Sequence, residues 1–230
     1  MEKKKVIAAA LIAAGLVVAG MFMYLGLREV ALKDRAVTVK GLSTRDVMAD
    51  YVVWPLEFQI SGNDLKDVSK QMDRIMATAK QFFLDKGFQE NDIRSGNTSV
   101  EDKWASVYGE RKPASRYCVH HTMVIATADV ERVLSCMESQ NELLGQGVVL
   151  NSYQWNTDYQ FRGLNELKPE MIEEATKNAR AVAQKFADDA QCSLGTIRRA
   201  SQGQFSVDAD NNQPWMKHVR VVTTVDYTLR

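Results

Sequence analysis

The fold class of this chain follows from one stretch of sequence, YVVWPLEFQI at residues 51–60. All its even-numbered positions are apolar, whereas the odd-numbered ones include Pro55, Glu57 and Gln59. Apolar residues at every second position are typical of a β-strand with one buried face. Because proline cannot donate a hydrogen bond to a neighbouring strand, we predict that this strand is bulged or lies at a sheet edge at Pro55.

A helix is expected to follow this strand. Apolar residues recur three and four positions apart from Leu65 to Phe83. Asn63 or Asp64 can cap the start of such a helix, and Gly87 can end it. The two elements together predict a helix packed on a strand.

The other elements have similar signatures. Strands are expected at 36–40, 92–101, 116–127, 148–161, 194–207 and 218–229, with a polar turn region at 41–50. A second helix is predicted from Asp129 to Leu144, and a third has Pro169 in its first turn and a stripe rich in alanine. Because most strands are joined by hairpins, we predict an α+β fold of mostly antiparallel strands with about three helices.

An uncharged apolar run extends from Val6 to Leu27. It is long enough to supply the roughly 20 residues that cross a hydrocarbon core. We therefore predict an uncleaved transmembrane signal anchor over 6–27. The small residues Val17 and Ala19 leave a cleaved signal peptide, and a soluble periplasmic protein, as the alternative.

The charges beside this run predict its orientation. Lys3, Lys4 and Lys5 precede the run, and the charges that follow it nearly cancel. The positive-inside rule then places residues 1–5 in the cytoplasm as a basic tip. Residues 28–35 become a linker, and residues 36–230 a periplasmic domain large enough for two subdomains, 36–145 and 146–230.

The overall charge argues against nucleic acid as a partner. The chain has 29 basic and 29 acidic residues, and no basic cluster appears beyond the N-terminus. We also find no nucleophile elbow, phosphate-binding glycine loop or metalloprotease helix motif. We therefore expect a protein that is not an enzyme and that carries no cofactor.

Three cysteines, Cys118, Cys136 and Cys192, allow at most one intrachain disulfide. A remaining thiol can be buried, paired between subunits or redox-active. We favour burial, because free cysteine is among the most buried residue types.

His120 and His121 are the most obvious candidates for metal ligands. Adjacent strand residues face opposite sides, so the two histidines cannot hold one ion, whereas Cys118 and His120 share a face. A zinc site would still need His218 or a carboxylate, because zinc takes three or four protein ligands. We interpret these residues as ordinary strand histidines and keep Cys118, His120 and His218 as weak metal candidates.

Several short patterns occur in the order and spacing of a known family. They are Val37, Val39 and Gly41; Ala49 to Val52, in place of a Pro-Asp-x-Ala turn; Lys86 to Gln89 with Asp92 and Ile93; the alanines at 175, 179, 183 and 190; Leu194 to Ile197; and Val219, Val221, Val225 and Tyr227. Over residues 36–229 the chain resembles the SIMPL domain family of exported bacterial proteins. It departs from the family where Ala49 replaces a proline and where Cys192 replaces a glycine.

The resemblance implies a SIMPL-like domain in the bacterial cell envelope with a role in oxidative-stress defence, and no catalytic motif to carry over. Long strands and a membrane tether favour a homo-oligomer, for which a ring is one form. One alternative function is a thiol or metal redox protein that uses the cysteines and histidines. Another is a module that binds a peptide or envelope polymer through Trp104, Tyr108, Trp155 and Trp215; no small-molecule ligand can be named.

Overall fold

The computed structural model describes residues 13–27, 35–105, 112–151 and 156–230. The described chain forms two compact units that are interleaved in sequence. Unit 1 contains the described residues up to Arg45 together with Asn165–Val207 and His218–Arg230, and unit 2 contains Asp46–Leu164 and Asp208–Lys217. These units do not coincide with the sequence halves 36–145 and 146–230.

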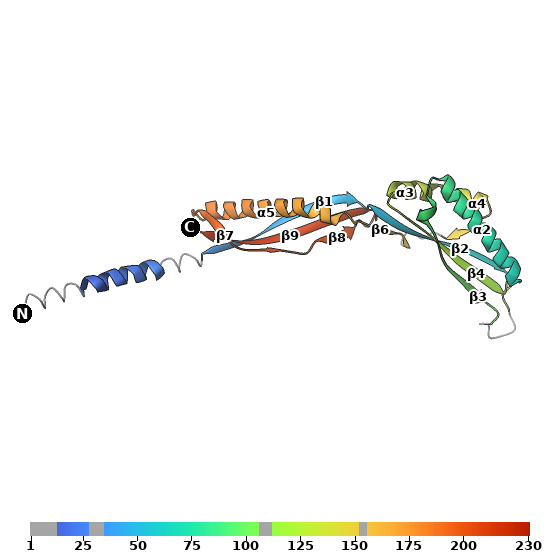
Figure 1. Ribbon diagram of the computed structural model, residues 1–230, viewed down its shortest axis with the longest axis horizontal. Coiled ribbons are helices and arrows are strands. Elements are labelled where there is room, and N and C mark those ends of the chain that lie inside the picture. The colour runs from blue at the N-terminus through green and yellow to red at the C-terminus, as the bar shows by residue number, and fades with distance from the viewer. Residues whose placement is uncertain (1–12, 28–34, 106–111, 152–155) are drawn as a thin grey trace, which may run out of the picture. The chain divides into compact units, whose positions relative to one another are not determined.

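Unit 2 is built on an antiparallel sheet. Within the described residues its order is β3-β4-β2-β5, and β6 also pairs with β2. The strands are β2 (Tyr51–Gly62), β3 (Ile93–Asp102), β4 (Tyr117–Thr127), β5 (Leu150–Asn151) and β6 (Asp158–Gln160). The helices of this unit are α2 (Leu65–Asp85), α3 (Val130–Ser139) and α4 (Asn141–Gly145), and the short 3-10 helix η1 (Glu90–Asp92) leads into β3 (Figure 1).

The alternating stretch at 51–60 forms β2, as predicted. β4 pairs with it along its whole length, with Pro55 opposite Val124. On the other side of β2, the pairing with β6 ends at Val53 and the pairing with β5 begins at Glu57. On this side of β2, Pro55 therefore falls between the part that pairs with β6 and the part that pairs with β5. The single long strand expected at 148–161 is wrong, because the described residues 148, 149, 156 and 157 belong to neither β5 nor β6. Residues 152–155 lie outside the described part.

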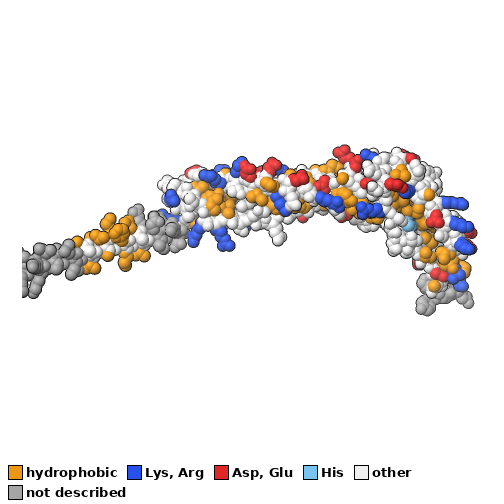
Figure 2. Space-filling model, in the orientation of Figure 1, with side chains coloured by type: hydrophobic (Ala, Val, Ile, Leu, Met, Phe, Trp, Pro, Cys, Tyr) orange, Lys and Arg blue, Asp and Glu red, His pale blue; other side chains and the backbone are white. Residues whose placement is uncertain are grey.

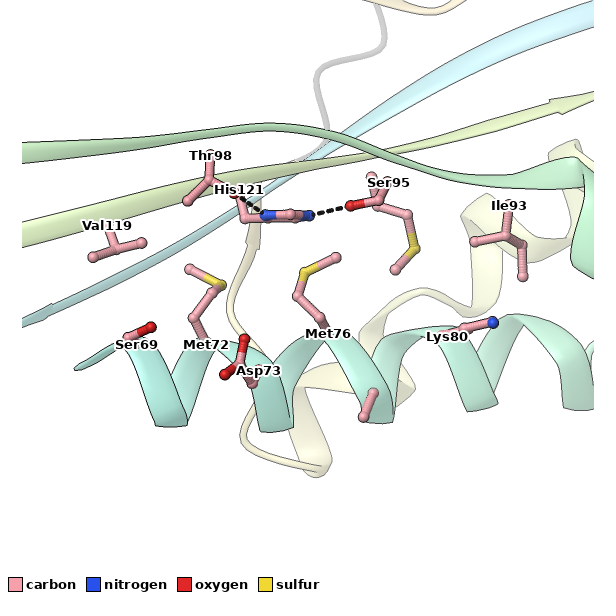
Figure 3. A pocket seen from close by; sticks show the side chains of 12 residues that line it. Ser69, Met72, Asp73, Met76, Lys80, Ile93, Ser95, Thr98, Val119 and His121 are labelled. Atoms are coloured by element: carbon pink, nitrogen blue, oxygen red, sulfur yellow. Dashed lines mark hydrogen bonds between the residues drawn. The ribbon is translucent and has the colours of Figure 1, made fainter. Parts of the chain in front are cut away.

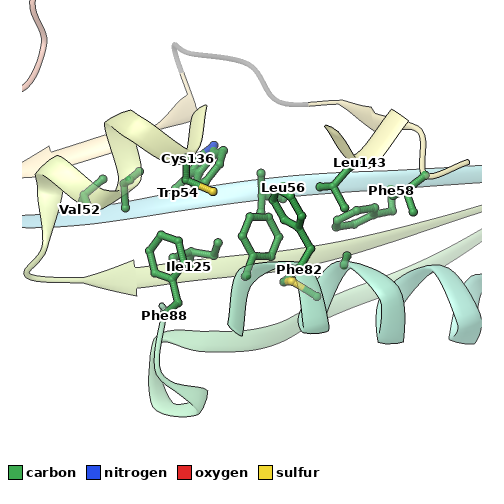
Figure 4. Close-up of a cluster of buried hydrophobic side chains, with 14 of the residues drawn as sticks. Val52, Trp54, Leu56, Phe58, Phe82, Phe88, Ile125, Cys136 and Leu143 are labelled. Carbon is green, nitrogen blue, oxygen red and sulfur yellow. The ribbon is translucent and has the colours of Figure 1, made fainter. Parts of the chain in front are cut away.

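The predicted helix after β2 is confirmed as α2. Asp64 caps it by accepting a hydrogen bond from the Asp67 N–H, and Gly87 follows it with a φ of +89°. The even-numbered side chains of β2 form the core with this helix. Trp54, Leu56 and Phe58 are fully buried (Figure 4). The rings of Trp54 and Phe83 meet edge to face, with their centroids 5.8 Å apart.

Unit 1 is built on a second sheet of order β1-β9-β7, with β8 beside β9. The strands are β1 (Ala36–Met48), β7 (Leu194–Gln202), β8 (Ser206–Ala209) and β9 (Met216–Leu229). The polar turn expected at 41–50 is wrong, because β1 continues to Met48. Its polar side chains have partners instead: Arg45 forms ion pairs with Glu170 at 3.1 Å and with Glu174 at 2.7 Å.

Helix α5 (Leu164–Asp189) lies against β1 (Figure 1). Its buried face is a stripe of alanines, all with no exposed surface, at Ala175, Ala179, Ala183 and Ala187. A Cβ on Gly41 would overlap the Ala175 carbonyl and lie 2.6 Å from the Ala179 nitrogen. Helix α5 and strand β1 therefore approach each other closely, which the small alanine side chains permit.

Helix α5 also begins before Pro169, the residue expected in its first turn. The cause is Asp50, whose carboxylate accepts hydrogen bonds from the backbone N–H groups of Arg162 at 2.8 Å and Gly163 at 2.7 Å. These donors immediately precede the helix, where N–H groups lack helical partners. A side chain distant in sequence therefore fixes the start of α5.

Residues 13–27 form a helix, and one face of it is seen in Figure 2. Apolar side chains are exposed at consecutive positions, as at Leu16, Val17 and Val18, and so point in different directions around the helix. The preceding part of the apolar run, residues 6–12, lies outside the described residues, as do the basic tip 1–5 and residues 28–34 of the linker. Within the described part of the chain, no helix combines the length and the apolar character needed to cross a membrane.

Candidate functional site

The two faces of the β3-β4-β2 sheet in unit 2 carry different groups of polar residues. Strand alternation places His121 on the face that packs against α2 and His120 on the opposite face. His121 hydrogen-bonds Ser95 and Thr98, whereas His120 contacts Glu57 and Cys118. The two neighbouring histidines therefore belong to different environments, as strand geometry predicts.

The face away from α2 holds a compact group around Cys118. Its Sγ lies 3.3 Å from His120 Nε2 and accepts hydrogen bonds from Gln59 Nε2 at 3.0 Å and Ser61 Oγ at 3.3 Å. The register explains the contacts, because Ser61 pairs with Cys118 and Gln59 pairs with His120. Cys118 is fully buried among these side chains.

Two carboxylates complete this group. The Oε1 atom of Glu57 lies 3.0 Å from His120 Nδ1. Glu101, opposite Cys118 on β3, places a carboxylate oxygen, the Cys118 Sγ and a His120 nitrogen within 4.8 Å of one another. We refer to Glu101, Cys118 and His120 as the Cys118 cluster.

Sequence reasoning placed Cys118 and His120 together but missed both carboxylates. The strands 92–101 and 116–127 were predicted, but their sequences do not show the register that sets Glu101 opposite Cys118. His218 is not part of the Cys118 cluster: it belongs to unit 1.

The face toward α2 contains a cleft of about 650 Å³ between α2, β3 and β4. His121 lies on its sheet side, where Ser95 Oγ is 3.0 Å from Nε2 and Thr98 Oγ1 is 2.7 Å from Nδ1 (Figure 3). A register shift between Ser95 and Thr98 accompanies this double contact. Met72 and Met76 project from α2 into the cleft (Figure 3). Both ring nitrogens of His121 are thus engaged by hydroxyl groups.

The three cysteines are free thiols in separate places. Cys136 is buried on α3, and burial raises the pKa of its thiol to about 11. Cys192 is half-buried in unit 1, and its Sγ donates to the Ala187 carbonyl at 3.5 Å. The fraction of Cys136 thiolate at neutral pH is therefore very small, which makes this residue unsuited to thiol chemistry.

The aromatic residues considered for polymer binding do not gather into one described surface. The Trp215 ring lies 6.2 Å from the ring of Tyr159, and both pack on the core of unit 2. Trp104 Nε1 donates to the Pro113 carbonyl at 3.1 Å, and Arg116 lies over its ring. Tyr108 and Trp155 lie outside the described residues.

Two antiparallel sheets, one packed against α2 and α3 and the other against α5, define an α+β protein. The family model described as "SIMPL: Protein of unknown function (DUF541)" matches residues 37–225, so the chain belongs to the SIMPL family. This match confirms the resemblance found in the sequence. A search of curated proteins finds no match.

Proposed function

We propose that this chain is a membrane-tethered SIMPL protein of the bacterial cell envelope that self-associates outside the cytoplasm and is not an enzyme. The main support for the tether is the apolar run from Val6 to Leu27. Its three preceding lysines favour a cytoplasmic N-terminus and a periplasmic α+β part.

The side chains of the helix at residues 13–27 support this proposal. Leu16, Phe22 and Met23 expose 69%, 72% and 67% of their surface. Apolar surface of this extent is unfavourable in water and marks a region that a membrane or a protein covers. A lipid bilayer would cover all sides of the helix at once.

Membrane extraction tests the tether. The full chain is expressed in a bacterium, membranes are washed with alkaline carbonate, and the mass of the recovered protein is measured. We expect the protein in the membrane pellet with residues 1–27 retained. A matched chain whose residues 1–27 are replaced by a cleavable signal peptide should appear in the periplasmic fraction. Recovery of the natural chain there, cut after Ala19, would contradict the tether.

Open sheet edges support self-association. Among the described residues, β1 and β7 end one sheet and β3 forms an edge of the other. Most residues of β3 and β7 are exposed, and such edges can pair with another chain. A tether would add to this tendency by concentrating copies in the membrane plane.

Mass photometry tests self-association by comparing residues 28–230 with the full chain in detergent. We expect oligomers of the full chain and a smaller oligomeric fraction without the N-terminal helix. If both samples are strictly monomeric, the assembly proposal fails, whereas the tether proposal is unaffected.

A role in oxidative-stress defence is proposed from the family resemblance alone. A strain lacking the gene should lose peroxide tolerance and regain it with the natural chain. Because the proposed role does not depend on thiol chemistry, a chain with Cys118, Cys136 and Cys192 all changed to serine should restore tolerance equally. Failure of that chain alone, at normal protein level, would favour a thiol mechanism.

A further inference from the structure

We propose that the Cys118 cluster is a zinc-binding site on the face of the sheet away from α2. Cys118 Sγ, His120 Nε2 and a Glu101 carboxylate oxygen are its protein ligands, and Glu57 orients the imidazole. The proposed function needs no metal, so this inference goes beyond it.

The distances between the ligand atoms fit a tetrahedral zinc ion. With zinc–sulfur and zinc–nitrogen bonds of about 2.3 and 2.0–2.1 Å, the two ligand atoms lie about 3.5 Å apart. The observed distance between Cys118 Sγ and His120 Nε2 is 3.3 Å. The Glu101 oxygen lies within 4.8 Å of Cys118 Sγ and of a His120 nitrogen, so a small side-chain movement brings it to the ion.

The Glu57 carboxylate prepares His120 as a ligand. Its Oε1 lies 3.0 Å from His120 Nδ1, and a carboxylate at this position accepts a hydrogen bond from a protonated Nδ1. The other nitrogen, Nε2, then directs its lone pair toward Cys118. A carboxylate that holds a histidine in this way is typical of the residues around zinc sites.

The strands hold the three ligands in place. Cys118 and His120 are two positions apart on β4, and Glu101 is the cross-strand partner of Cys118 on β3. Gln59 and Ser61 on β2 donate hydrogen bonds to the sulfur from the other side. Because Glu101 is exposed, an ion can reach the site from solvent.

The ligand types select the metal. One thiolate, one imidazole and one carboxylate suit zinc, whereas magnesium and calcium prefer oxygen ligands alone. Three protein ligands leave a fourth position for water or a small ligand.

The test measures zinc binding to the full chain in detergent after treatment with a chelator. Zinc ions alone are titrated by calorimetry, and bound metal is counted after dialysis. We expect one zinc ion per chain and no displacement by excess magnesium. Cys118→Ser and His120→Gln should abolish stoichiometric binding. Glu57→Gln should weaken it about 10–100-fold, since the carboxylate that holds a histidine ligand in place typically contributes that much to metal affinity.

The controls separate this site from general binding by histidine and cysteine. His121→Gln changes the neighbouring histidine on the opposite face, and Cys192→Ser changes a thiol in unit 1; both should bind zinc like the natural chain. If Cys118→Ser fails to fold by circular dichroism, zinc titration of Glu101→Gln and Glu57→Gln tests the site instead, because Glu101 is exposed and Glu57 is partly exposed. Both variants should bind zinc more weakly than the natural chain. Absence of stoichiometric zinc, or equal losses in His121→Gln and His120→Gln, would overturn the proposal.

Discussion

At the scale of the residue, Asp50 links the sequence resemblance to a physical role. It stands in the segment that resembles the family's Pro-Asp-x-Ala turn, and its carboxylate accepts hydrogen bonds from the two residues before α5. Helix N-termini lack internal acceptors and favour negative charge. The aspartate is therefore explained by helix capping and requires no catalytic role.

We expect Asp50→Ala to lower the free energy of unfolding by about 1–2 kcal/mol, as for the loss of a helix cap. Asp50→Asn keeps an acceptor oxygen and should be affected less. Urea unfolding followed by circular dichroism measures both variants. Equal stability of Asp50→Ala and the natural chain would show that the cap contributes nothing.

Asp129 gives a prediction for pH dependence. The Arg132 backbone N–H donates to Asp129 Oδ1 at 2.9 Å, and with the Arg132 side chain it lowers the pKa of this carboxyl. The charged cap makes its full contribution to the free energy of unfolding above the pKa of an aspartate in the unfolded chain, which is about 3.9. It is lost as the pH falls through the lower folded pKa.

Accordingly, Asp129→Ala should cost about 1 kcal/mol of stability near pH 7. The difference between this variant and the natural chain should begin to shrink below about pH 4, where the carboxyl of the unfolded chain takes up a proton, and should vanish below the lower folded pKa. Urea unfolding at a series of pH values measures this difference in the free energy of unfolding. A difference that grows toward low pH would contradict the assignment.

At the scale of the element, α5 packs on β1 through residues without large side chains. Gly41 faces the helix backbone at Ala175 and Ala179, so even a methyl group has no space there. We expect Gly41→Ala to destabilise the protein by about 1–3 kcal/mol or more, because overpacking forces backbone movement.

Thermal unfolding followed by circular dichroism measures this effect. Gly145→Ala is the matched control, because nothing lies within 4 Å of a Cβ placed there. Gly145→Ala should leave the midpoint temperature of thermal unfolding nearly unchanged. A Gly41→Ala variant as stable as this control would show that α5 does not pack tightly on β1.

The same elements show what sequence patterns can predict. Strand β2 and helix α2 follow from local periodicity, because burial of one face imposes a repeat on the residues themselves. The opposite environments of His120 and His121 also follow from strand geometry alone. Such features require no knowledge of distant parts of the chain.

Features set by distant residues could not be predicted in this way. The early start of α5 depends on Asp50, and the continuation of β1 past Gly41 accompanies ion pairs between Arg45 and residues of α5. Glu101 joins Cys118 only through the register of β3 and β4. The sequence contains all these residues but does not show which of them meet.

At the scale of the whole molecule, unit 2 depends on a second segment of the chain. The Ala49 N–H donates to the Trp215 carbonyl at 2.7 Å, and the Trp215 side chain packs on the core of unit 2. A fragment of residues 46–164 lacks this segment. We expect it to unfold at a lower temperature than the same fragment with residues 208–217 attached through a flexible linker.

Thermal unfolding of the two fragments by circular dichroism measures the difference. A linked fragment carrying Trp215→Ala is the control, and its unfolding temperature should fall most of the way back toward that of residues 46–164 alone. Identical melting of all three fragments would show that residues 208–217 do not stabilise unit 2.

The interleaving of the two units also affects folding during synthesis. β1 ends at residue 48, and its neighbour β9 begins at residue 216, so the first strand to be made must wait for almost the whole chain before it can pair. Contacts this distant in sequence slow folding and leave strand edges open meanwhile. A chain released before its last segment is synthesised would retain an unpaired β1, and aggregation or degradation of such truncated products is the expected result.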